Sequence, residues 1–153
     1  MISSTIYKLA RITERTGAFF QGKGYGSKSI TQEISMVEKL LRHSRQNSQN
    51  FLMIDIGGNV GNYASALREK FKEAEIHIFE PSTVNLKKIT DRFSNDNQIF
   101  VNPVGVSDAD RAETLYSDKP GSGLSSLSKR RLEHHNVSFD VTEEIKVIRF
   151  DGY

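Results

Sequence analysis

The clearest hydrophobic pattern along the chain is a run of six residues at 51–56, which reads F-L-M-I-D-I and has one polar member. It lacks the alternation of a half-exposed strand and is typical of a strand buried on both faces of a parallel sheet. Glycines follow at once, and then a helical pattern begins. A glycine turn lets the backbone approach a ligand, and the free N–H groups of the first helical turn then face it. The sequence therefore predicts a nucleotide site just after this strand.

Two more strands and two helices follow the turn in a regular order. Apolar positions at helical spacing after Gly61 predict one helix, and residues 74–79 predict a second strand. Pro81 and Ser82 open another helical pattern, and residues 99–101 are a third apolar run. This β-α-β-α-β order predicts an α/β fold with one half of a doubly wound parallel sheet.

The N-terminal part of the chain carries weaker patterns. Residues 1–28 predict a short amphipathic helix and a glycine-rich linker, and we expect the helix to pack on the domain edge rather than lie on a membrane. Residues 29–153 form the partial nucleotide-binding domain. Its first helix is expected to start behind the cap residue Ser29, with Ile30, Ile34 and further apolar residues in one stripe.

The last fifty residues predict a hairpin-like addition to the parallel strands. Residues 104–108 are expected to run on from the third strand. Residues 113–117 and 144–150 have the patterns of short strands, the second with clear alternation. Between them lie a loop rich in glycine and serine at 119–128 and a short basic helix at 129–135.

The spacing of the turn glycines narrows the ligand. A dinucleotide fingerprint, G-x-G-x-x-G, would need glycine at Asn59 and Asn62, or at Val60 and Tyr63. Residues 55–61, D-I-G-G-N-V-G, instead fit acid-x-G-x-x-x-G. A second acid, Glu80, ends the second strand 25 residues after Asp55. A carboxylate in that place is the expected partner of ribose hydroxyls.

Composition limits the class of protein but does not identify its activity. Hydrophobic residues are 37% and charged residues 26% of the chain, as in ordinary soluble domains. The net charge of +2 implies no general field for nucleic acid, and the lack of cysteine excludes disulfides, thiol catalysis and thiolate metal sites. No apolar run approaches the roughly 20 residues of a membrane span, and the N-terminus has no signal-peptide pattern. We expect a soluble, cytoplasmic protein.

The motifs together resemble the class I S-adenosylmethionine (SAM) methyltransferases. Residues 55–61 are similar to their first motif, D/E-x-G-x-G-x-G, with Asn59 at the middle glycine. Within that class, the order of F-E-P at 79–81, V-G-V-S-D at 104–108 and V-I-R-F-D-G-Y at 147–153 resembles the FkbM-type family. The likeness covers roughly residues 30–153. It implies a Rossmann-like sheet, SAM as cofactor, and O-methylation of a hydroxyl on a small acceptor such as a sugar or secondary metabolite.

The resemblance also implies which residues hold SAM. They are the turn residues and those that end the next two strands: Asp55, Gly57, Gly58, Asn59, Gly61, Glu80, Pro81 and Val104. Val104 would lie near adenine. The loop 121–126 and Tyr116 are candidates for the acceptor pocket. No metal ligand is assigned, because the adjacent His134 and His135 would point about 100° apart on a helix. No catalytic residue is assigned either, because a general base is expected from the strands that the resemblance shows to be missing.

The resemblance breaks off at Tyr153. Members of the family continue into a fourth strand that pairs with the strand at 51–56, and without it that strand is an unpaired edge that favours self-association. We therefore expect a truncated sheet, and favour a fragment of a longer protein whose activity alone is open. Two alternatives remain: a non-catalytic interaction module, or an NAD-binding Rossmann protein, which the glycine spacing disfavours.

Purely structural roles, without any ligand, also remain open for the candidate residues. Asp55 could simply cap the glycine turn or the following helix. The three glycines could serve only the close packing of strand on helix, and Glu80 could be a solvated charge at a strand end.

Overall fold

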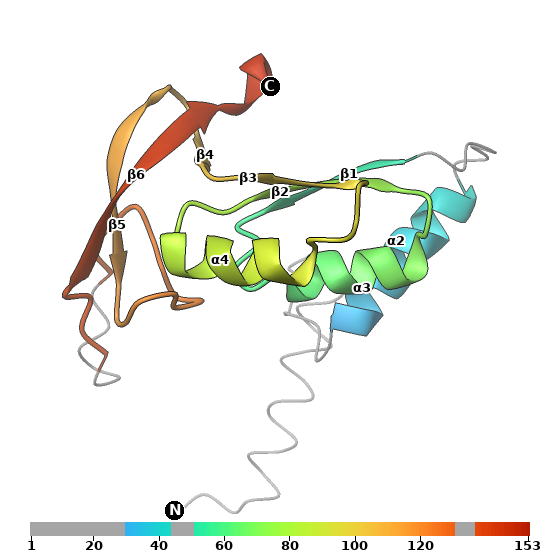
Figure 1. The fold of residues 1–153 in the computed structure, drawn as a ribbon, viewed down its shortest axis with the longest axis horizontal. Helices are drawn as coiled ribbons and strands as arrows, with labels where there is room; N and C mark the ends of the chain where they lie inside the picture. The colour runs from blue at the N-terminus through green and yellow to red at the C-terminus, as the bar shows by residue number, and fades with distance from the viewer. Residues whose placement is uncertain (1–29, 44–50, 131–136) are drawn as a thin grey trace, which may run out of the picture. The chain divides into compact units, whose positions relative to one another are not determined.

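The computed structural model describes residues 30–43, 51–130 and 137–153 (Figure 1). The predictions for the N-terminal helix, the linker, the cap Ser29 and most of the basic helix lie outside these residues. The described residues belong to two compact units, which meet between Arg45 and Gln46 in the sequence. Each unit is described by itself.

The first unit contributes one described helix, α2 (Ile30–His43). Its existence confirms the helix expected from the apolar stripe. Ile34 is buried, whereas Met36 and Leu40 are exposed.

The second unit begins with a three-stranded parallel sheet. Its strands are β1 (Leu52–Ile56), β2 (Glu75–Phe79) and β3 (Ile99–Asn102), in the order β1-β2-β3. Helices α3 (Asn62–Lys70) and α4 (Thr83–Arg92) form the two crossovers and lie on the same side of the sheet (Figure 1). The predicted β-α-β-α-β order is confirmed. The fold is α/β and compatible with a Rossmann-like sheet.

The helix-covered face of this sheet is the core of the unit. Ile76 and Ile78 of β2 are fully buried there, as are Ala64 of α3 and Ile89 of α4. Arg68 of α3 closes the end of the layer: it donates to the Asp96 carboxylate at 2.7 Å and to the carbonyls of Phe71, Lys72 and Ala74.

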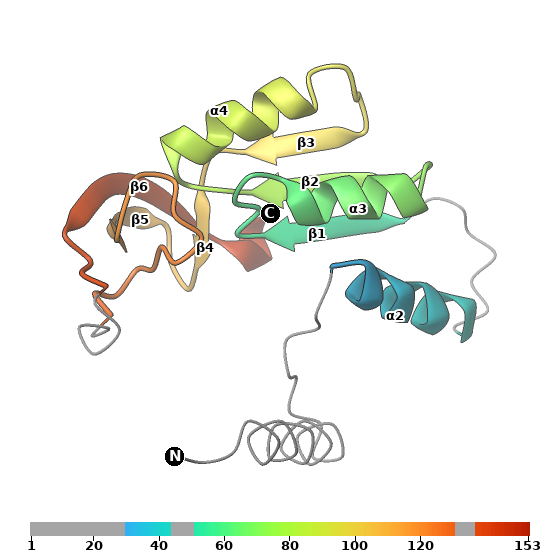
Figure 2. The same ribbon diagram turned by 90° about the horizontal axis from the view of Figure 1, so that it is seen from below.

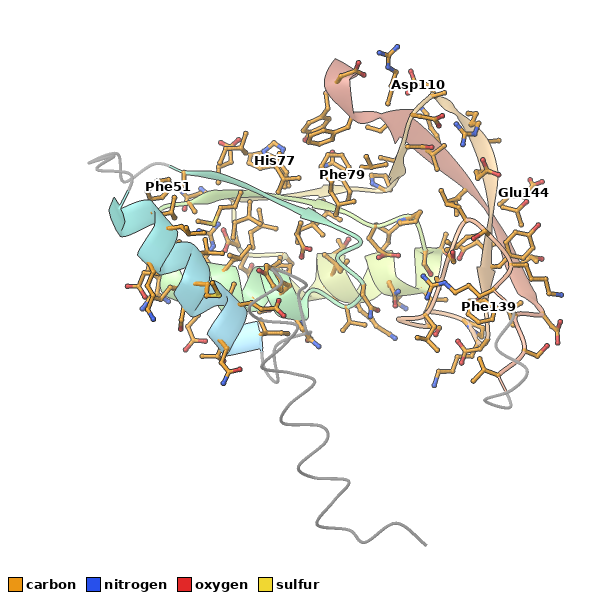
Figure 3. All side chains as sticks on the ribbon, turned by 180° about the vertical axis from the view of Figure 1, so that it is seen from behind. Phe51, His77, Phe79, Asp110, Phe139 and Glu144 are labelled. Carbon is orange, nitrogen blue, oxygen red and sulfur yellow. The ribbon has the colours of Figure 1, made fainter. Side chains whose placement is uncertain are left out.

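The opposite face of the sheet is largely open at β1. Leu52, Ile54 and Ile56 are exposed, so the prediction that this strand is buried on both faces is wrong. The reason within this unit is that β1 pairs only with β2 among the described strands, and that α3 and α4 both lie on the other side of the sheet. The expected unpaired edge is thus confirmed for the described part of the chain. Farther along, His77 and Phe79 lie on this face, in ring contact with Tyr153 (Figure 3).

The chain then enters a second sheet. Residues 104–108 do not continue β3 as predicted, because the chain turns at Pro103 and β4 (Gly105–Ser107) pairs elsewhere. The second sheet has the order β4-β6-β5, with β6 (Val141–Arg149) antiparallel to β5 (Arg111–Ser117) and parallel to β4 (Figure 2). The predicted hairpin-like addition is confirmed. Its core is Leu115, Ile145 and Val147.

Candidate functional site

The turn after β1, residues 57–61, is called the glycine loop below. The N–H groups of Gly57 and Gly58 both donate to the carbonyl oxygen of Phe79, the last residue of β2, at 2.8 and 3.1 Å. Gly57, Asn59 and Gly61 have φ of 81°, 50° and 77°, a region that favours glycine and tolerates asparagine. The loop is therefore held to the carboxyl end of the neighbouring strand by its own backbone.

Two of the loop glycines are required by packing alone. A Cβ on Gly58 would lie 2.3 Å from Cγ2 of Ile78, and one on Gly61 would lie 2.8 Å from the ring of Phe93. These contacts support the purely structural role that the sequence left open for the glycines, which is the close packing of strand on helix.

Glu80 joins the glycine loop to the start of α4. Its Oε2 accepts the backbone N–H of Asn59 at 2.8 Å, and its Oε1 accepts the backbone N–H of Ser82 at 2.9 Å. The residue is only 6% exposed, so it is not the solvated strand-end charge considered from the sequence. The glycine motif that begins at Asp55 and the acidic residue 25 positions later are thus brought into direct contact.

The electrostatic setting of Glu80 is unusual for a surface carboxylate. Burial raises the pKa of Glu80, while the N–H groups of Ser82 and Asn59 and the side chain of Asn85 partly offset the rise. The Glu143 carboxylate raises this pKa further. Glu143 itself accepts the N–H of Thr83 at 2.8 Å, so two carboxylates cap the N-terminus of α4.

Asp55 lies on the helix-covered side of β1 rather than on the open side. Burial raises the pKa of Asp55, and the backbone N–H of Ala64 in the first turn of α3 lowers it in part. Its Oδ2 lies 3.6 Å from the position of a Cβ on Gly58. This geometry favours the alternative role of Asp55, a support of the loop and of the helix N-terminus.

Pro81 and Val104 complete the set predicted from the sequence. Cγ of Pro81 lies 3.7 Å from the position of a Cβ on Gly105, and Val104 directly precedes that residue. Val104 is half-buried and follows the end of β3. Every candidate residue beyond the strands thus lies where the three parallel strands end, the edge at which α/β sheets bind ligands.

Sequence reasoning missed Asn85 and Ser82 as members of the site. Both are 1% exposed. The buried side-chain oxygens without a hydrogen-bond partner, among the described residues, are Asp55 Oδ2, Asn59 Oδ1, Ser82 Oγ, Asn85 Oδ1 and Asp118 Oδ1. Buried polar atoms are nearly always paired, so the open oxygens of Asn59, Ser82 and Asn85, the three residues that hydrogen-bond to Glu80, point to a ligand or water that bonds to them. A helical asparagine carries no sequence signal of this role.

The segment between β5 and β6 closes over this edge. A Cβ on Gly123 would lie 2.9 Å from Nδ2 of Asn59, and one on Gly121 would lie 2.8 Å from Oδ1 of Asn85. The glycine- and serine-rich loop, which the sequence placed near an acceptor pocket, therefore lies directly against the predicted cofactor residues.

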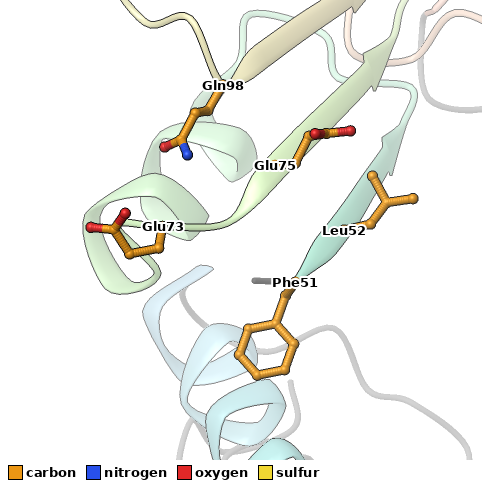
Figure 4. Close-up of a pocket in the computed structure, with 5 residues that line it drawn as sticks. All are labelled: Phe51, Leu52, Glu73, Glu75 and Gln98. Carbon is orange, nitrogen blue, oxygen red and sulfur yellow. The ribbon is translucent and has the colours of Figure 1, made fainter. Parts of the chain in front are cut away.

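Two pockets flank the parallel sheet. One, of about 270 Å³, lies at the amino ends of the strands and is lined by Phe51, Leu52, Glu73, Glu75 and Gln98 (Figure 4). It is at the wrong edge of a parallel sheet for a nucleotide. The other, of about 220 Å³, lies beside the N-terminus of α4 and includes Leu115, Ser117, Gly121, Ser125 and Glu143 in its lining. Gly121 and Ser125 of the loop predicted for the acceptor pocket line it, whereas Tyr116, also predicted there, does not.

The histidines contribute nothing to this edge in the described part of the chain. His77 lies on the open face of the sheet, with Nδ1 2.5 Å from the Tyr153 hydroxyl and Nε2 2.8 Å from Glu75. His134 and His135 lie outside the described residues. Within the described ranges no three His, Asp or Glu residues are grouped to hold a metal, and no helix is long and apolar enough to cross a bilayer.

No protein-family model matches the chain, and no curated protein matches it. The resemblance to FkbM-type methyltransferases therefore stays a prediction from the motifs.

Proposed function

We propose that the protein is the cofactor-binding part of a class I, SAM-dependent O-methyltransferase. One observation carries the proposal: the carboxylate that ends β2, Glu80, is bonded to the glycine loop through the N–H of Asn59 at 2.8 Å. A glycine turn and an acidic strand end in contact at the carboxyl edge of a parallel sheet are the two parts that a nucleoside cofactor needs.

The residues of this edge fit the parts of SAM. The ribose hydroxyls would donate to the second lone pairs of Glu80 and to the open side-chain oxygens of Asn59 and Asn85. Val104 would lie near adenine. The glycine loop would hold the rest of the cofactor, with Asp55 supporting the loop from beneath.

SAM supplies an activated methyl group on its sulfonium, so the protein's own task is alignment and exclusion of water. The 220 Å³ pocket beside α4 is the candidate for the acceptor, a sugar or secondary-metabolite hydroxyl, because serine hydroxyls and Glu143 line it. No residue of the described chain is assigned as a general base.

Calorimetric titration with SAM, its demethylated product S-adenosylhomocysteine, and NAD tests this proposal. We expect the first two to bind and NAD to bind at least about tenfold more weakly. Glu80→Gln should weaken SAM binding, whereas Glu144→Gln, an exposed glutamate on β6, should leave it unchanged. Tighter binding of NAD than of SAM, or no binding of SAM by the folded chain, would reject the assignment.

A second candidate function, self-association as an interaction module, is favoured by the exposed apolar side chains of β1. Leu52 is 59% exposed on a strand whose outer edge pairs with no described strand. Such an edge is a template for pairing with another chain. Leu52→Lys should shift sedimentation-velocity profiles toward the monomer, and identical profiles for both proteins would argue against this role.

A further inference from the structure

Residues 119–125, called the cover below, form a compact turn of their own. At its base Tyr116 and Ser126 exchange two backbone hydrogen bonds, of 2.8 and 2.9 Å. Within it Ser122 is buried, accepts the N–H of Leu124 through its hydroxyl at 3.0 Å, and receives the Ser125 hydroxyl on its carbonyl at 2.8 Å. The cover is therefore an ordered element with a narrow, two-residue base.

The other side of the cover touches the ligand edge through its glycines. Gly123 approaches Asn59, and Gly121 approaches Asn85 and Val84 so closely that a Cβ would lie within 3 Å of each side chain. Both asparagine carbonyl oxygens stay unpartnered although they are buried. The contact thus buries these polar groups without satisfying them.

We propose that the cover is a gate over the ligand edge, which must leave Asn59 and Asn85 before a nucleoside-like ligand can reach them and Glu80. This inference rests on the proposed function and adds a step to it. The ligand class follows from the groups that the open cover would uncover. These are hydrogen-bond acceptors, the side-chain oxygens of Asn59 and Asn85, so the edge selects a group with several hydrogen-bond donors, such as a vicinal diol.

The energetics favour a gate that opens easily. Polar oxygens that are buried without partners destabilise the closed arrangement, and a ligand that donates to them would replace the cover at no loss of hydrogen bonds. A protein that binds only in its open form has an apparent Kd equal to the intrinsic Kd divided by the open fraction. Holding the cover shut should therefore weaken binding strongly, and loosening it should strengthen binding.

An engineered cross-link tests the gate directly. A Cβ on Gly121 would lie 3.4 Å from the Cβ of Val84, close to the roughly 3.5–4.5 Å found in disulfides. The chain has no cysteine of its own, so within one molecule the double variant Val84→Cys, Gly121→Cys can form only this disulfide, and non-reducing electrophoresis would separate it from disulfide-linked dimers. SAM binding would be measured by calorimetry before and after oxidation and again after reduction, with both single variants as controls for the substitutions themselves.

We expect oxidation to weaken SAM binding by about tenfold or more in the double variant alone, and reduction to restore it. Equal binding by the oxidised and reduced double variant would overturn the gate and leave the proposed function standing. Absence of SAM binding by the unmodified chain would instead overturn the proposed function and the gate that rests on it.

A milder variant keeps the gate testable if the cross-linked protein does not fold. Gly123→Ala crowds Asn59 and should loosen the cover, raising amide hydrogen exchange at residues 121–124 and increasing SAM affinity by about two- to fivefold. Gly152→Ala is the matched control, because a Cβ there meets no atom within 4 Å. Unchanged exchange and affinity in Gly123→Ala would count against the gate.

Discussion

Glu80 and Arg68 of the parallel layer differ in their contacts from Arg111 of the second sheet. In the parallel layer, Glu80 and Arg68 are largely buried, and each combines backbone partners nearby in the sequence with one partner more than 20 residues away, Asn59 for Glu80 and Asp96 for Arg68. In the second sheet, Arg111 is exposed and pairs only with its near neighbours Asp108 and Glu113, at 2.7 Å each. Ion pairs of the second kind contribute little to stability, whereas buried groups that satisfy backbone atoms contribute much.

This difference indicates where the site obtains its rigidity. The parallel strands carry no hairpin, so their connections must be fixed by side chains that reach across loops. The antiparallel strands β5 and β6 align through seven paired positions and need no such support. Glu80 and Arg68 should therefore be sensitive to substitution, and Arg111 tolerant.

The largest effect is expected for Glu80→Ala. The N–H groups of Asn59 and Ser82 would lose their acceptor in a buried place, which should lower the free energy of unfolding by about 2–4 kcal/mol. Urea denaturation followed by circular dichroism would measure it. The exposed Glu144→Ala serves as the matched control, and similar midpoints for the two variants would contradict the structural role of Glu80.

Arg68→Ala should come next. It removes a 2.7 Å contact with Asp96 and leaves carbonyls of the α3–β2 connection, including that of Ala74, without a donor. A loss of about 1–3 kcal/mol is expected in the same urea experiment. Arg68→Lys keeps the charge but cannot reach all these oxygens, so full rescue by lysine would show that charge alone matters.

A smaller effect is expected in the pH dependence of the contribution that Glu80 makes to the free energy of unfolding. Because burial raises the pKa of Glu80, its protonated form is favoured in the folded state, and the associated stability is complete below the ordinary value of 4.5. That stability is lost as pH rises through the raised pKa. The unfolding free energy of the wild type minus that of Glu80→Gln should therefore fall as pH increases from about 4.5 to neutrality; a difference that rises with pH would contradict the assigned shift.

Arg111→Ala should have the smallest effect. Its partners Asp108 and Glu113 are in the same exposed turn and strand, where water and salt screen the charges. We expect a urea midpoint within measurement error of the wild type, in both low and high salt. A loss comparable to that of Arg68→Ala would remove the contrast between the two sheets.

Most of the fold of the second unit is predictable from the sequence because its signals are local. Apolar runs mark the three parallel strands, and the glycines at 57–61 mark the loop. The burial of β1 is not predictable in this way, because it depends on which strands and helices cover it. The exit of the chain at Pro103 into a second sheet also depends on distant pairing with β6.

The candidate site is likewise predictable where its signals are local and not predictable where it depends on distant contacts. The sequence places Asp55, the loop glycines and Glu80 at one edge, since parallel strands end together. It does not reveal that both oxygens of Glu80 bind backbone N–H groups, or that Asn85 joins them. Nor does it predict that Gly121 and Gly123 pack on the asparagines, because that contact joins segments about 40 to 60 residues apart and involves no distinctive motif.

The double hydrogen bond from Gly57 and Gly58 to the Phe79 carbonyl has a consequence for recognition. A ligand that reaches this edge meets a backbone that is already ordered. The protein therefore loses little conformational entropy when the complex forms. Because the N–H groups of Gly57 and Gly58 already donate to Phe79, they are not available to donate hydrogen bonds to the ligand. Selectivity must then reside in side chains, and replacing Asn85, which lies outside the glycine loop, should alter which ligand is preferred.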